Sequence, residues 1–490
     1  MSGIAPRPAS EFTSYDLTAD VVVVGYGCAG ASAAFEATQS GVDVLVIERS
    51  SGAGGASALS GGELYLGGGT PIQKACGFDD TPDAMAAFLR AALGPGADAA
   101  KIDRYCEASV AHFHWLVECG VPFTPSLWDA PAWVPPTEDG LMWLGENSWP
   151  FTEIATPAPR GHRPAARDFG GWLLMDRLTT AAESRGARVR YDTYATSLIV
   201  AEDGSVTGLV ARSYGDELSI HARHGVVLTT GGFVDNDVML AAHAPRLLEH
   251  TKVSGGTDDG SGIRMAQAIG AGVRHMSAGQ VGIALVPGMA ARGVIVNGGG
   301  QRFINEDTYP GRIGQAALFQ QDMDVWVILD EQAYEDVPEP QRWGVRPQHV
   351  AGSAAELAEL LGIPPDALAH TLSRYNEHAA RGADPDCHKS ARWLRPLRPP
   401  LAAIDVRAGV RPPSESGDRR GTGASVFTLG GLHTGVDGQV LDVDGTQIPG
   451  LFAAGRASSG LHAWGYISGT SLGDGTFFGR EAGRSAARSR

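Results

Sequence analysis

The stretch DVVVVGYGCAG at residues 20–30 decides the fold of this chain. Its first half, residues 20–24, is β-branched and apolar without alternation, as in a parallel strand that is buried on both faces. Three glycines follow with the spacing G-x-G-x-x-G. Gly25 permits a tight turn, Gly27 lets the backbone approach a diphosphate, and Gly30 lets the next helix pack closely on the strand. The stretch therefore predicts a strand, turn and helix that bind a dinucleotide.

The residues after the glycine turn extend this pattern. Residues 31–40 are expected to form a helix whose N-terminal amides and dipole favour a diphosphate. Residues 42–47 predict the next strand, which delivers Glu48 where a carboxylate can accept hydrogen bonds from both hydroxyls of a ribose. The chain holds 66 glycines, so the glycine spacing alone is weak evidence. Strand, turn, helix, strand and acid in this order predict dinucleotide binding.

Further glycine-rich segments favour FAD over a nicotinamide cofactor. One lies at 54–62, directly after the first two strands, and a second ends an apolar stretch at 224–233. A third, at 449–456, precedes a helix expected to begin near Leu472, whose dipole would stabilise negative charge on a reduced flavin. Helix capping is the alternative for this last segment. The expected contacts of a non-covalently bound FAD are Gly25, Gly27, Cys28, Ala29, Gly30, Glu48, Arg49, Gly55, Ala56, Ser57, Ser60, Gly61, Gly62, Ala195, Gly231, Gly232, Gly455, Arg456, Ser471 and Leu472.

Composition excludes several classes of protein. The chain has 490 residues, with 39 basic and 55 acidic side chains and a net charge of -16, which argues against a nucleic-acid partner. No apolar run is long enough to cross a bilayer, and the first 20 residues lack a basic stretch followed by an apolar core, so we expect a cytoplasmic protein without an integral membrane segment. Five cysteines without metal or C-x-x-C spacing predict free buried thiols and no metal site.

Motifs along the whole chain resemble a known group of flavoproteins. TDDG at 257–260 and GQRFINE at 300–306 are similar to motifs of the fumarate reductase and 3-ketosteroid dehydrogenase superfamily. YLGGGT at 65–70, NEDTY at 305–309 and GYISGTSLGDG at 465–475 resemble more closely the 3-ketosteroid delta-4-(5α)-dehydrogenases. The chain is thus identified as a suspected member of that subfamily.

The resemblance implies an α/β fold with a discontinuous FAD-binding domain. This Rossmann-like domain would comprise residues 18–278 and 427–490, and an α+β substrate-binding and catalytic domain, residues 279–426, would be inserted between them. The active site would lie at the junction of the two domains. An aromatic-rich excursion at about 113–172 is either part of a steroid pocket or a satellite core, and the second is favoured for any one tryptophan.

The resemblance also implies a reaction: dehydrogenation of a 5α-3-ketosteroid between carbons 4 and 5. Tyr466 would donate a hydrogen bond to the 3-keto oxygen, helped by the amide of Gly469. Ser468 would lie near carbon 4 and pass the proton to Tyr309, while FAD N5 would accept the hydride. From spacing alone, Tyr466 is equally well a core residue with a satisfied hydroxyl, and Ser468 could cap the last helix.

Other activities stay open. Fumarate reductases place an arginine proton donor soon after the Asn-Glu pair, where this chain has Tyr309 and Pro310, so dicarboxylate chemistry is disfavoured. Arg312 lies nearby, and we expect it to pair with Glu306 or Asp307 on the surface. The remaining alternatives are delta-1 or 5β dehydrogenation, an ene reductase, and a flavin-binding or ligand-binding protein without turnover.

Two more expectations concern partners and the end of the chain. No Fe-S cysteine set, haem motif or second dinucleotide fingerprint is evident, so the electron acceptor would be external, a quinone or a redox protein. Trp464 is the best tryptophan candidate for the substrate pocket because it stands beside Tyr466. The charged tail at 480–490 is expected to be a helix end that frays.

Overall fold

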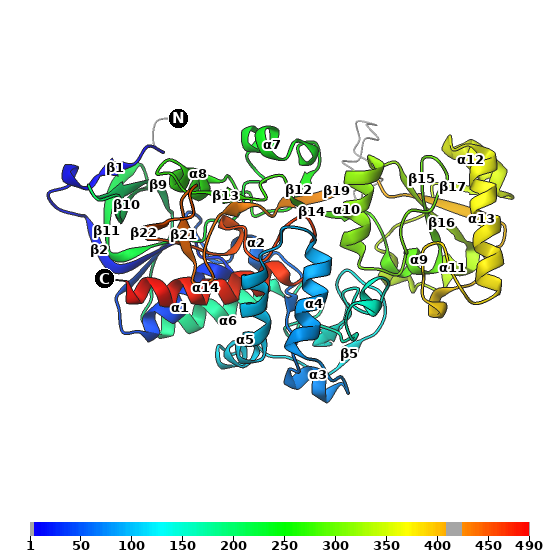
Figure 1. The fold of residues 1–490 in the computed structure, drawn as a ribbon, viewed down its shortest axis with the longest axis horizontal. Helices are drawn as coiled ribbons and strands as arrows, with labels where there is room; N and C mark the ends of the chain where they lie inside the picture. The colour runs from blue at the N-terminus through cyan, green and yellow to red at the C-terminus, as the bar shows by residue number, and fades with distance from the viewer. Residues whose placement is uncertain (1–3, 408–423, 490) are drawn as a thin grey trace.

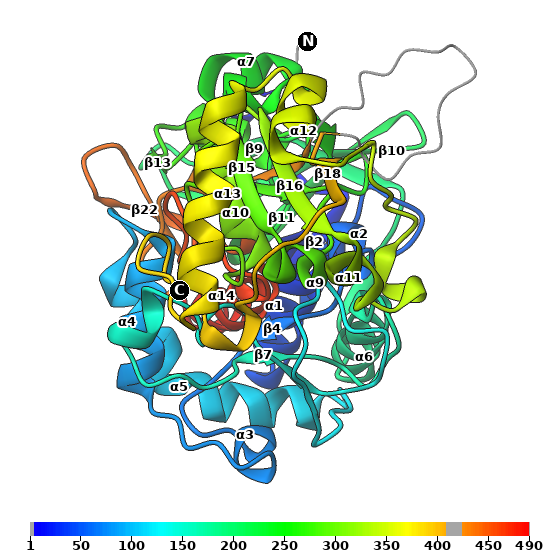
Figure 2. The same cartoon turned by 90° about the vertical axis from the view of Figure 1, so that its right-hand side faces the viewer.

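The computed structural model describes residues 4–407 and 424–489, which form a larger and a smaller body side by side (Figures 1 and 2). The larger body, on the left of Figure 1, contains both ends of the chain and is built on a nine-stranded sheet. The smaller body, on the right, is built on a four-stranded sheet and carries α12 and α13 on its outer side. A short three-stranded sheet lies between the two bodies.

Parallel strands form the centre of the nine-stranded sheet, as the apolar sequence predicts. β22 and β2 flank β11 and run parallel to it, and β3 and β8 continue in parallel beyond β2. β9, β10 and β11 form an antiparallel meander on the other side. The strands of this sheet are β1 (Arg7–Pro8), β9 (Thr193–Val200), β10 (Val206–Ser213), β11 (Asp216–Leu228), β2 (Leu17–Val24), β3 (Val44–Ile47), β8 (Arg188–Arg190), β22 (Gln447–Ala453) and β21 (Gln439–Leu441).

The central strand β2 is buried on both faces, which explains its unbroken run of valines. Val21 and Val23 belong to the core cluster that packs under α1 and α14, whereas Val22 and Val24 belong to the cluster on the opposite face. The first helix, α1 (Cys28–Gln39), begins three residues earlier than expected, because Cys28 and Ala29 already form its first turn. The second strand begins at Val44 rather than at residue 42.

Helix α1 packs along the last helix, α14 (Thr470–Arg488), in the lower part of the larger body (Figure 1). Glycines at three successive turns of α14 permit this close approach, because a Cβ at Gly479 or Gly483 would overlap backbone atoms of α1 and one at Gly475 would lie 2.8 Å from Cys28 Sγ. The expectation that the charged tail frays is wrong. Arg480 and Arg484 bind the carboxylate of Glu36 on α1 at 2.6 and 2.9 Å, so the tail is pinned to the core.

Helices and a small sheet complete the larger body. The small sheet has the order β4 (Leu64–Tyr65), β7 (Gly161–His162), β6 (Leu141–Met142), β5 (Leu127–Trp128). The helices are α2 (Gly55–Ala58), α3 (Pro71–Ala75), α4 (Pro82–Leu93), α5 (Ala99–Glu118), α6 (Gly171–Ser184), α7 (Asp237–His243) and α8 (Ser261–Gln267). In the aromatic segment, Phe113, Trp115 and Phe151 are core residues, as the satellite-core interpretation expects, whereas Trp172 is 57% exposed.

The smaller body is an antiparallel sheet in the order β15 (Val294–Asn297), β16 (Val325–Asp330), β18 (Leu401–Asp405), β17 (His349–Ala351). Its helices are α9 (Pro287–Arg292), α10 (Pro310–Gln321), α11 (Glu331–Glu335), α12 (Ala354–Leu361) and α13 (Pro365–Ala380). The connecting sheet has the order β12 (Thr251–Lys252), β19 (Ala424–Thr428), β14 (Gly279–Ile283), and β13 (Val273–Arg274) pairs with β20 (Gly431–Leu432). Strands that precede the smaller body in the sequence thus pair with a strand that follows it.

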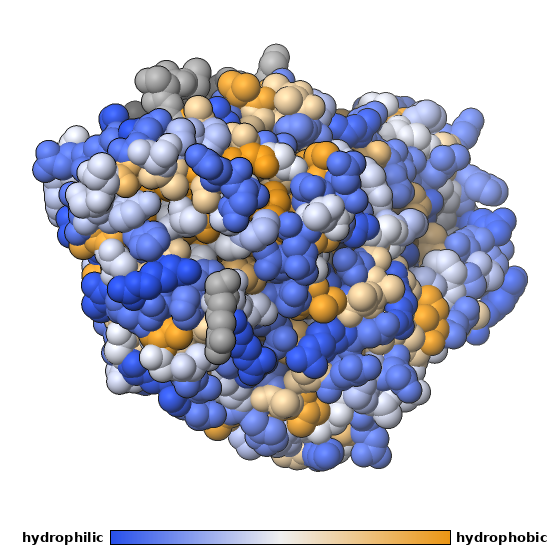
Figure 3. All heavy atoms as spheres, turned by 60° about the vertical axis from the view of Figure 1, so that its left-hand side comes forward, coloured by the Kyte–Doolittle hydropathy of each residue, from blue (hydrophilic) through white to orange (hydrophobic). Residues whose placement is uncertain are grey.

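The surface and the cysteines fit an ordinary globular protein. Figure 3 shows a face on which hydrophilic side chains dominate and apolar ones are scattered. All five cysteines are free, but Cys76 and Cys387 are partly exposed, so the expectation of buried thiols is wrong for these two. Within residues 4–407 and 424–489, no helix has the length and hydropathy to span a bilayer, and no group of metal-ligating side chains is present.

Candidate active site

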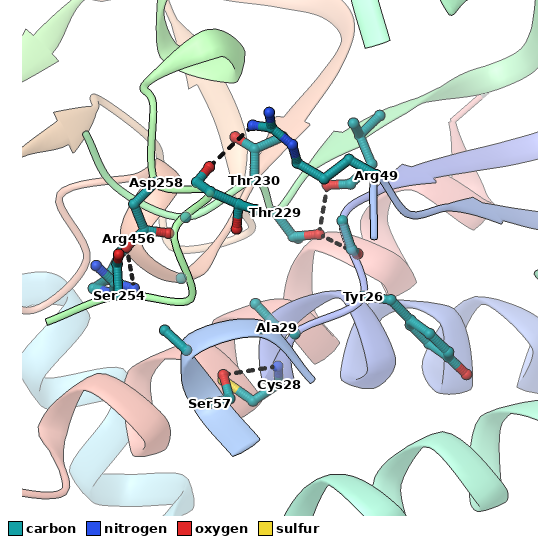
Figure 4. A pocket seen from close by; sticks show the side chains of 18 of the residues that line it. Tyr26, Cys28, Ala29, Arg49, Ser57, Thr229, Thr230, Ser254, Asp258 and Arg456 are labelled. Atoms are coloured by element: carbon teal, nitrogen blue, oxygen red, sulfur yellow. Dashed lines mark hydrogen bonds and ion pairs between the residues drawn. The ribbon is translucent and has the colours of Figure 1, made fainter. Parts of the chain in front are cut away.

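The main cavity has a volume of about 480 Å³ and lies where the parallel strands of the large sheet end. Its walls come from the turn after β2, from α2, from β9, from the turn after β11, and from the residues that precede α14. Figure 4 shows Ser57, Thr229, Thr230, Asp258 and Arg456 around one space, with Cys28 and Ala29 at the start of α1. Segments from both ends of the chain therefore meet around one cavity.

The glycine turn after β2 has the geometry that its sequence predicts. Gly25 has a φ of +100°, and a Cβ there would lie 2.6 Å from the Thr229 carbonyl oxygen. A Cβ at Gly30 would overlap the Gly25 carbonyl oxygen, so α1 can begin this close to the strand only with glycine at position 30. The Cys28 amide donates to Ser57 Oγ at 3.2 Å, which joins α1 to α2 across the cavity floor (Figure 4).

Glu48 lies at the end of β3 with its carboxylate at the cavity. The side chain is 8% exposed, and its two oxygens accept hydrogen bonds from the backbone amides of Tyr26 at 2.7 Å and Ser50 at 2.8 Å. A carboxylate has about four acceptor positions, so acceptors remain for ligand hydroxyls. The carboxylate is thus fixed beside the glycine turn, where a ribose diol would lie.

Several buried polar atoms at the cavity have no hydrogen-bond partner in the described part of the chain. They include Thr230 Oγ1, Arg456 Nη1 and Ser471 Oγ. The other nitrogen of Arg456, Nη2, forms an ion pair with Asp258 at 2.5 Å, which aligns the guanidinium at the cavity wall. Buried polar atoms are normally satisfied, so this cluster indicates a polar ligand. Unpaired donors, a glycine turn at a helix N-terminus and an acid at the ribose position together fit FAD.

Most of the expected cofactor contacts line this cavity. Gly30, Gly61, Gly62 and Gly232 do not; they pack against neighbouring backbone or side chains instead. The expected residues that line it are Gly25, Gly27, Cys28, Ala29, Glu48, Arg49, Gly55, Ala56, Ser57, Ser60, Ala195, Gly231, Gly455, Arg456, Ser471 and Leu472.

Sequence reasoning did not name several polar residues of the cavity wall as site residues, among them Glu63, Thr229, Thr230 and Asp258. Asp258 belongs to the TDDG segment, which was linked to the superfamily but not to the cofactor. Glu63 directly follows the SGG segment at 60–62, and that adjacency was the available signal.

Tyr466 and Gly469 line the cavity just before α14. The Tyr466 side chain is 8% exposed and packs edge-on against Phe427 and in a stack with His462, at 5.3 and 5.6 Å between ring centroids. Burial raises the pKa of Tyr466 to about 12, and Ser471 opposes that shift. Gly469, with a φ of +81°, is the N-terminal cap of α14. A protonated phenol and a helix N-terminus therefore face the same space.

Tyr309 reaches the same region from the smaller body. It precedes α10 as its N-terminal cap residue and is buried. Burial raises the pKa of Tyr309 well above its ordinary value, Tyr466 raises it further, and the hydroxyl and amide of Ser468 lower it. The structure thus brings Tyr309 next to Ser468 and Tyr466, which are more than 150 residues away in sequence. Tyr309 and Ser468 do not themselves line the cavity.

Arg312 does not have the expected partners. Its Nη1 donates to the Trp149 carbonyl at 3.3 Å and to side-chain oxygens of Asn305 and Thr308, both at 3.2 Å. Glu306 binds Arg302 instead, at 2.8 Å. The expected surface ion pair of Arg312 with Glu306 or Asp307 is therefore wrong, because Glu306 is buried among other cations and Arg312 is held by neutral acceptors.

Trp464 also departs from its expected place. It is 55% exposed and lines a second cavity of about 510 Å³ together with Arg312 and Trp149, not the main cavity. Side chains on neighbouring positions of an irregular loop need not point the same way, so adjacency to Tyr466 was a poor guide.

The fold and site define a dinucleotide-binding flavoprotein. The chain belongs to the FAD-binding domain family, whose model matches residues 20–472, and FAD is its cofactor. It resembles the crystal structure of 3-ketosteroid-delta4-(5alpha)-dehydrogenase from Rhodococcus jostii RHA1 in complex with 4-androstene-3,17-dione, with 50% identity, a TM-score of 0.94, and coverage of 99% of this chain and 100% of that chain.

More distant relatives belong to the same superfamily. A probable fumarate reductase of Shewanella frigidimarina is 28% identical over 96% of this chain and 75% of its own length. A 3-oxosteroid 1-dehydrogenase of Mycolicibacterium smegmatis is 28% identical over 90% of this chain and 92% of its own length. The expected superfamily, the α/β fold and the FAD cofactor are thereby confirmed, and the chain is an FAD-dependent oxidoreductase.

Proposed function

We propose that this enzyme introduces the double bond between carbons 4 and 5 of 5α-3-ketosteroids. The observation that carries the proposal is the meeting of Tyr309, from the smaller body, with Ser468 and Tyr466 beside the FAD cavity. The dehydrogenase from Rhodococcus jostii, with 50% identity, supports the same activity for this chain. When bound, FAD supplies the hydride acceptor of the reaction.

Tyr466 would polarise the substrate ketone. A phenol with a pKa of about 12 stays protonated at neutral pH and can donate a hydrogen bond to the 3-keto oxygen. The Gly469 amide, at the N-terminus of α14, would donate a second bond and add the favourable end of the helix dipole. Donors fixed before the reaction stabilise the negative charge that develops on the oxygen, and this acidifies carbon 4.

Ser468 and Tyr309 would carry the proton away from carbon 4. A serine hydroxyl is a poor base by itself and needs a partner that accepts its proton. Tyr309 is buried against Ser468 and can accept one hydrogen bond while it donates another. Removal of the proton from carbon 4 and of the hydride from carbon 5 leaves the 4-ene-3-ketosteroid product.

Alternative activities remain weaker candidates. An ene reductase of the fumarate reductase type would need a cationic proton donor, but Arg312 lies in the second cavity and is held by neutral acceptors. Delta-1 and 5β dehydrogenation use the same kinds of residues and differ only in how the steroid lies. A flavin-binding or ligand-binding protein without turnover would have little use for a buried pair of tyrosines around a serine.

Four further features belong to the proposal. The FAD-binding domain comprises about 18–278 and 427–490, and the catalytic domain 279–426. FAD is bound non-covalently, since the cavity cysteine, Cys28, lies at the diphosphate end, where burial raises its pKa. The electron acceptor is an external quinone or redox protein. We also propose that the enzyme works in the cytoplasm.

The products of turnover test this function. The purified enzyme is incubated with a 5α-3-ketosteroid and an artificial electron acceptor, and the position of the new double bond is determined. A 4-ene product supports the proposal. A 1-ene product, turnover of only the 5β isomer, or no turnover of either isomer would each contradict it. Acid precipitation should release FAD into the supernatant, and FAD that stays with the pellet would contradict non-covalent binding.

A further inference from the structure

Glu63 is a buried carboxylate that the proposed chemistry leaves unused. It is 6% exposed and lines the main cavity together with Tyr466, Gly469 and Ser471. Its Oε1 has no hydrogen-bond partner within residues 4–407 and 424–489. A buried carboxylate oxygen without a partner is costly, so its retention at a cavity wall points to a role in binding or reaction.

The backbone holds Glu63 at the catalytic end of the cavity. The amide of Tyr65 donates to the Gly469 carbonyl at 3.0 Å, and a Cβ at Gly469 would lie 3.3 Å from the Glu63 carbonyl carbon. A Cβ at Gly61 would lie 2.5 Å from Glu63 Oε2, so glycine at position 61 leaves room for the carboxylate. Glu63 is thus packed directly against the start of α14.

Arg163 is the charged group that acts on Glu63, and Glu63 in turn acts on Tyr309 and Tyr466. Burial raises the pKa of Glu63, and Arg163 opposes the shift. Nη1 and Nη2 of Arg163 donate to backbone carbonyls such as those of Asp139 and Asp168, at 3.3 and 2.7 Å, whereas its Nε has no hydrogen-bond partner in the described part of the chain. Burial is the largest cause of the raised pKa of Tyr309 and of Tyr466, and the charge of Glu63 raises both pKa values further. One carboxylate therefore acts on both phenols of the site.

We propose that Glu63 is the terminal acceptor of the proton that leaves carbon 4, which reaches it through Ser468 and Tyr309. This inference rests on the proposed function. The carbon 4 to hydrogen bond breaks, its electron pair forms the double bond, and the hydrogen of carbon 5 leaves with its own pair to FAD. The steroid is oxidised, FAD is reduced, and the proton forms an O–H bond on Glu63.

Charge balance in the cavity favours this route. Reduction by a hydride adds one negative charge to the cofactor, and protonation of Glu63 removes one from the wall. The net charge at the cavity wall then stays constant, which avoids the cost of an extra charge beside a buried carboxylate.

Proton uptake without any steroid tests the role of Glu63 independently of turnover. FAD in the enzyme is photoreduced anaerobically in a weak buffer with a pH indicator dye. The wild type is expected to take up about one more proton per two electrons than Glu63→Gln, because a group whose pKa rises on reduction binds protons. Glu63→Asp should behave like the wild type. Glu146→Gln is the matched control, since Glu146 is buried but does not line the cavity. Equal uptake by the wild type and Glu63→Gln would overturn the proposal.

Rapid mixing with a 5α-3-ketosteroid gives the second readout. FAD reduction in Glu63→Gln is expected to be at least roughly 100-fold slower than in the wild type. The wild-type rate should fall as the pH decreases through the raised pKa of Glu63, because a protonated carboxyl accepts no proton, and Glu63→Gln should lack this decrease. Binding of a 4-ene-3-ketosteroid should change by no more than a few fold.

The outcomes separate the two proposals. A Glu63→Gln variant with a wild-type rate and pH profile would refute the proton acceptor while leaving the proposed function intact. If the steroid does not reduce the wild type, the proposed function is wrong, and the proton count alone decides whether Glu63 is protonated on reduction. FAD content and melting temperature identify any variant that has not folded.

Discussion

Burial has different consequences for different residues of the cavity. Burial keeps Tyr466 protonated at neutral pH, so it can only donate to a ketone oxygen. Glu48 is also buried, but two backbone amides fix its carboxylate, and that arrangement suits the recognition of a ligand hydroxyl. We therefore propose a role in the chemistry for Tyr466 and a role in cofactor binding for Glu48, which single substitutions can separate.

Replacement of Tyr466 with phenylalanine removes the hydroxyl and keeps the ring. We expect kcat to fall by about 100-fold or more, since one donor to a developing oxyanion contributes that much. FAD content should not change, because the ring contacts with Phe427 and His462 remain. Steady-state kinetics and the FAD absorbance of the purified variant check both statements. Turnover near the wild-type level would exclude Tyr466 as the ketone-binding donor.

Glu48→Ala should weaken FAD binding instead. The variant loses the acceptor for two buried amides and for the ribose hydroxyls, and charge-assisted hydrogen bonds contribute about 1.5–3 kcal/mol each. We therefore expect the Kd for FAD to rise by at least roughly tenfold. Fluorescence titration of the apoprotein with FAD measures it, with Tyr466→Phe as a control of unchanged affinity. A Glu48→Ala variant that retains full affinity would remove Glu48 from the cofactor site.

Residues with a fixed spacing to the glycine turn could be predicted, and residues whose role depends on distant partners could not. Gly25 and Glu48 follow from local geometry, because a strand, a turn and a helix determine where they lie. Arg312 was assigned to nearby acids, but its acceptors include Trp149, 163 residues away, and Glu306 is taken by Arg302. Sequence proximity says little about which charges meet in a buried region.

At the scale of elements, the packing of α14 on α1 links the start of α14, near Gly469, to the glycine turn at the start of α1. The N-termini of both helices face the main cavity, since Cys28 and Ala29 begin one helix and Gly469, Ser471 and Leu472 lie at the start of the other. A shift between the helices would move the diphosphate amides relative to the flavin end of the site.

Gly479→Ala tests this coupling. A Cβ at position 479 would overlap the Ala29 carbonyl, and overpacking of this kind costs about 1–3 kcal/mol. We expect a lower free energy of unfolding and weaker retention of FAD, both measurable by denaturant unfolding and by FAD titration. Gly52→Ala is the matched control, because a Cβ there meets no atom within 4 Å. Equal stability of the two variants would contradict close packing of α14 on α1.

Elements near the glycine motif were predicted within a few residues, and so was the start of the last helix, expected near Leu472 and found at Thr470, whereas the docking of its charged end was not. A charged terminal segment looks solvated in sequence, yet Arg480 and Arg484 find Glu36 more than 440 residues away. The glycine face of the helix meets α1, and this contact holds the charged end of the helix on the core. The contact of Arg480 and Arg484 with Glu36 depends on the pairing of α14 with α1, which neither segment predicts by itself.

At the scale of the whole molecule, the proposed active site is shared by the two bodies. The larger body supplies the cofactor cradle, Tyr466, Ser468 and Glu63, and the smaller body supplies Tyr309. The FAD-binding fold could be predicted from the motif order. Only the family resemblance predicted that Tyr309 and Ser468 lie close together, because no local sequence pattern links residues of two different bodies.

The absorbance of FAD during anaerobic mixing with a 5α-saturated 3-ketosteroid tests the central claim most directly. The account predicts that the saturated steroid bleaches the flavin and yields a 4-ene product, while a 4-ene-3-ketosteroid does not bleach it. Bleaching by the 4-ene steroid alone would move the chemistry to carbons 1 and 2, and bleaching by neither would contradict steroid dehydrogenation.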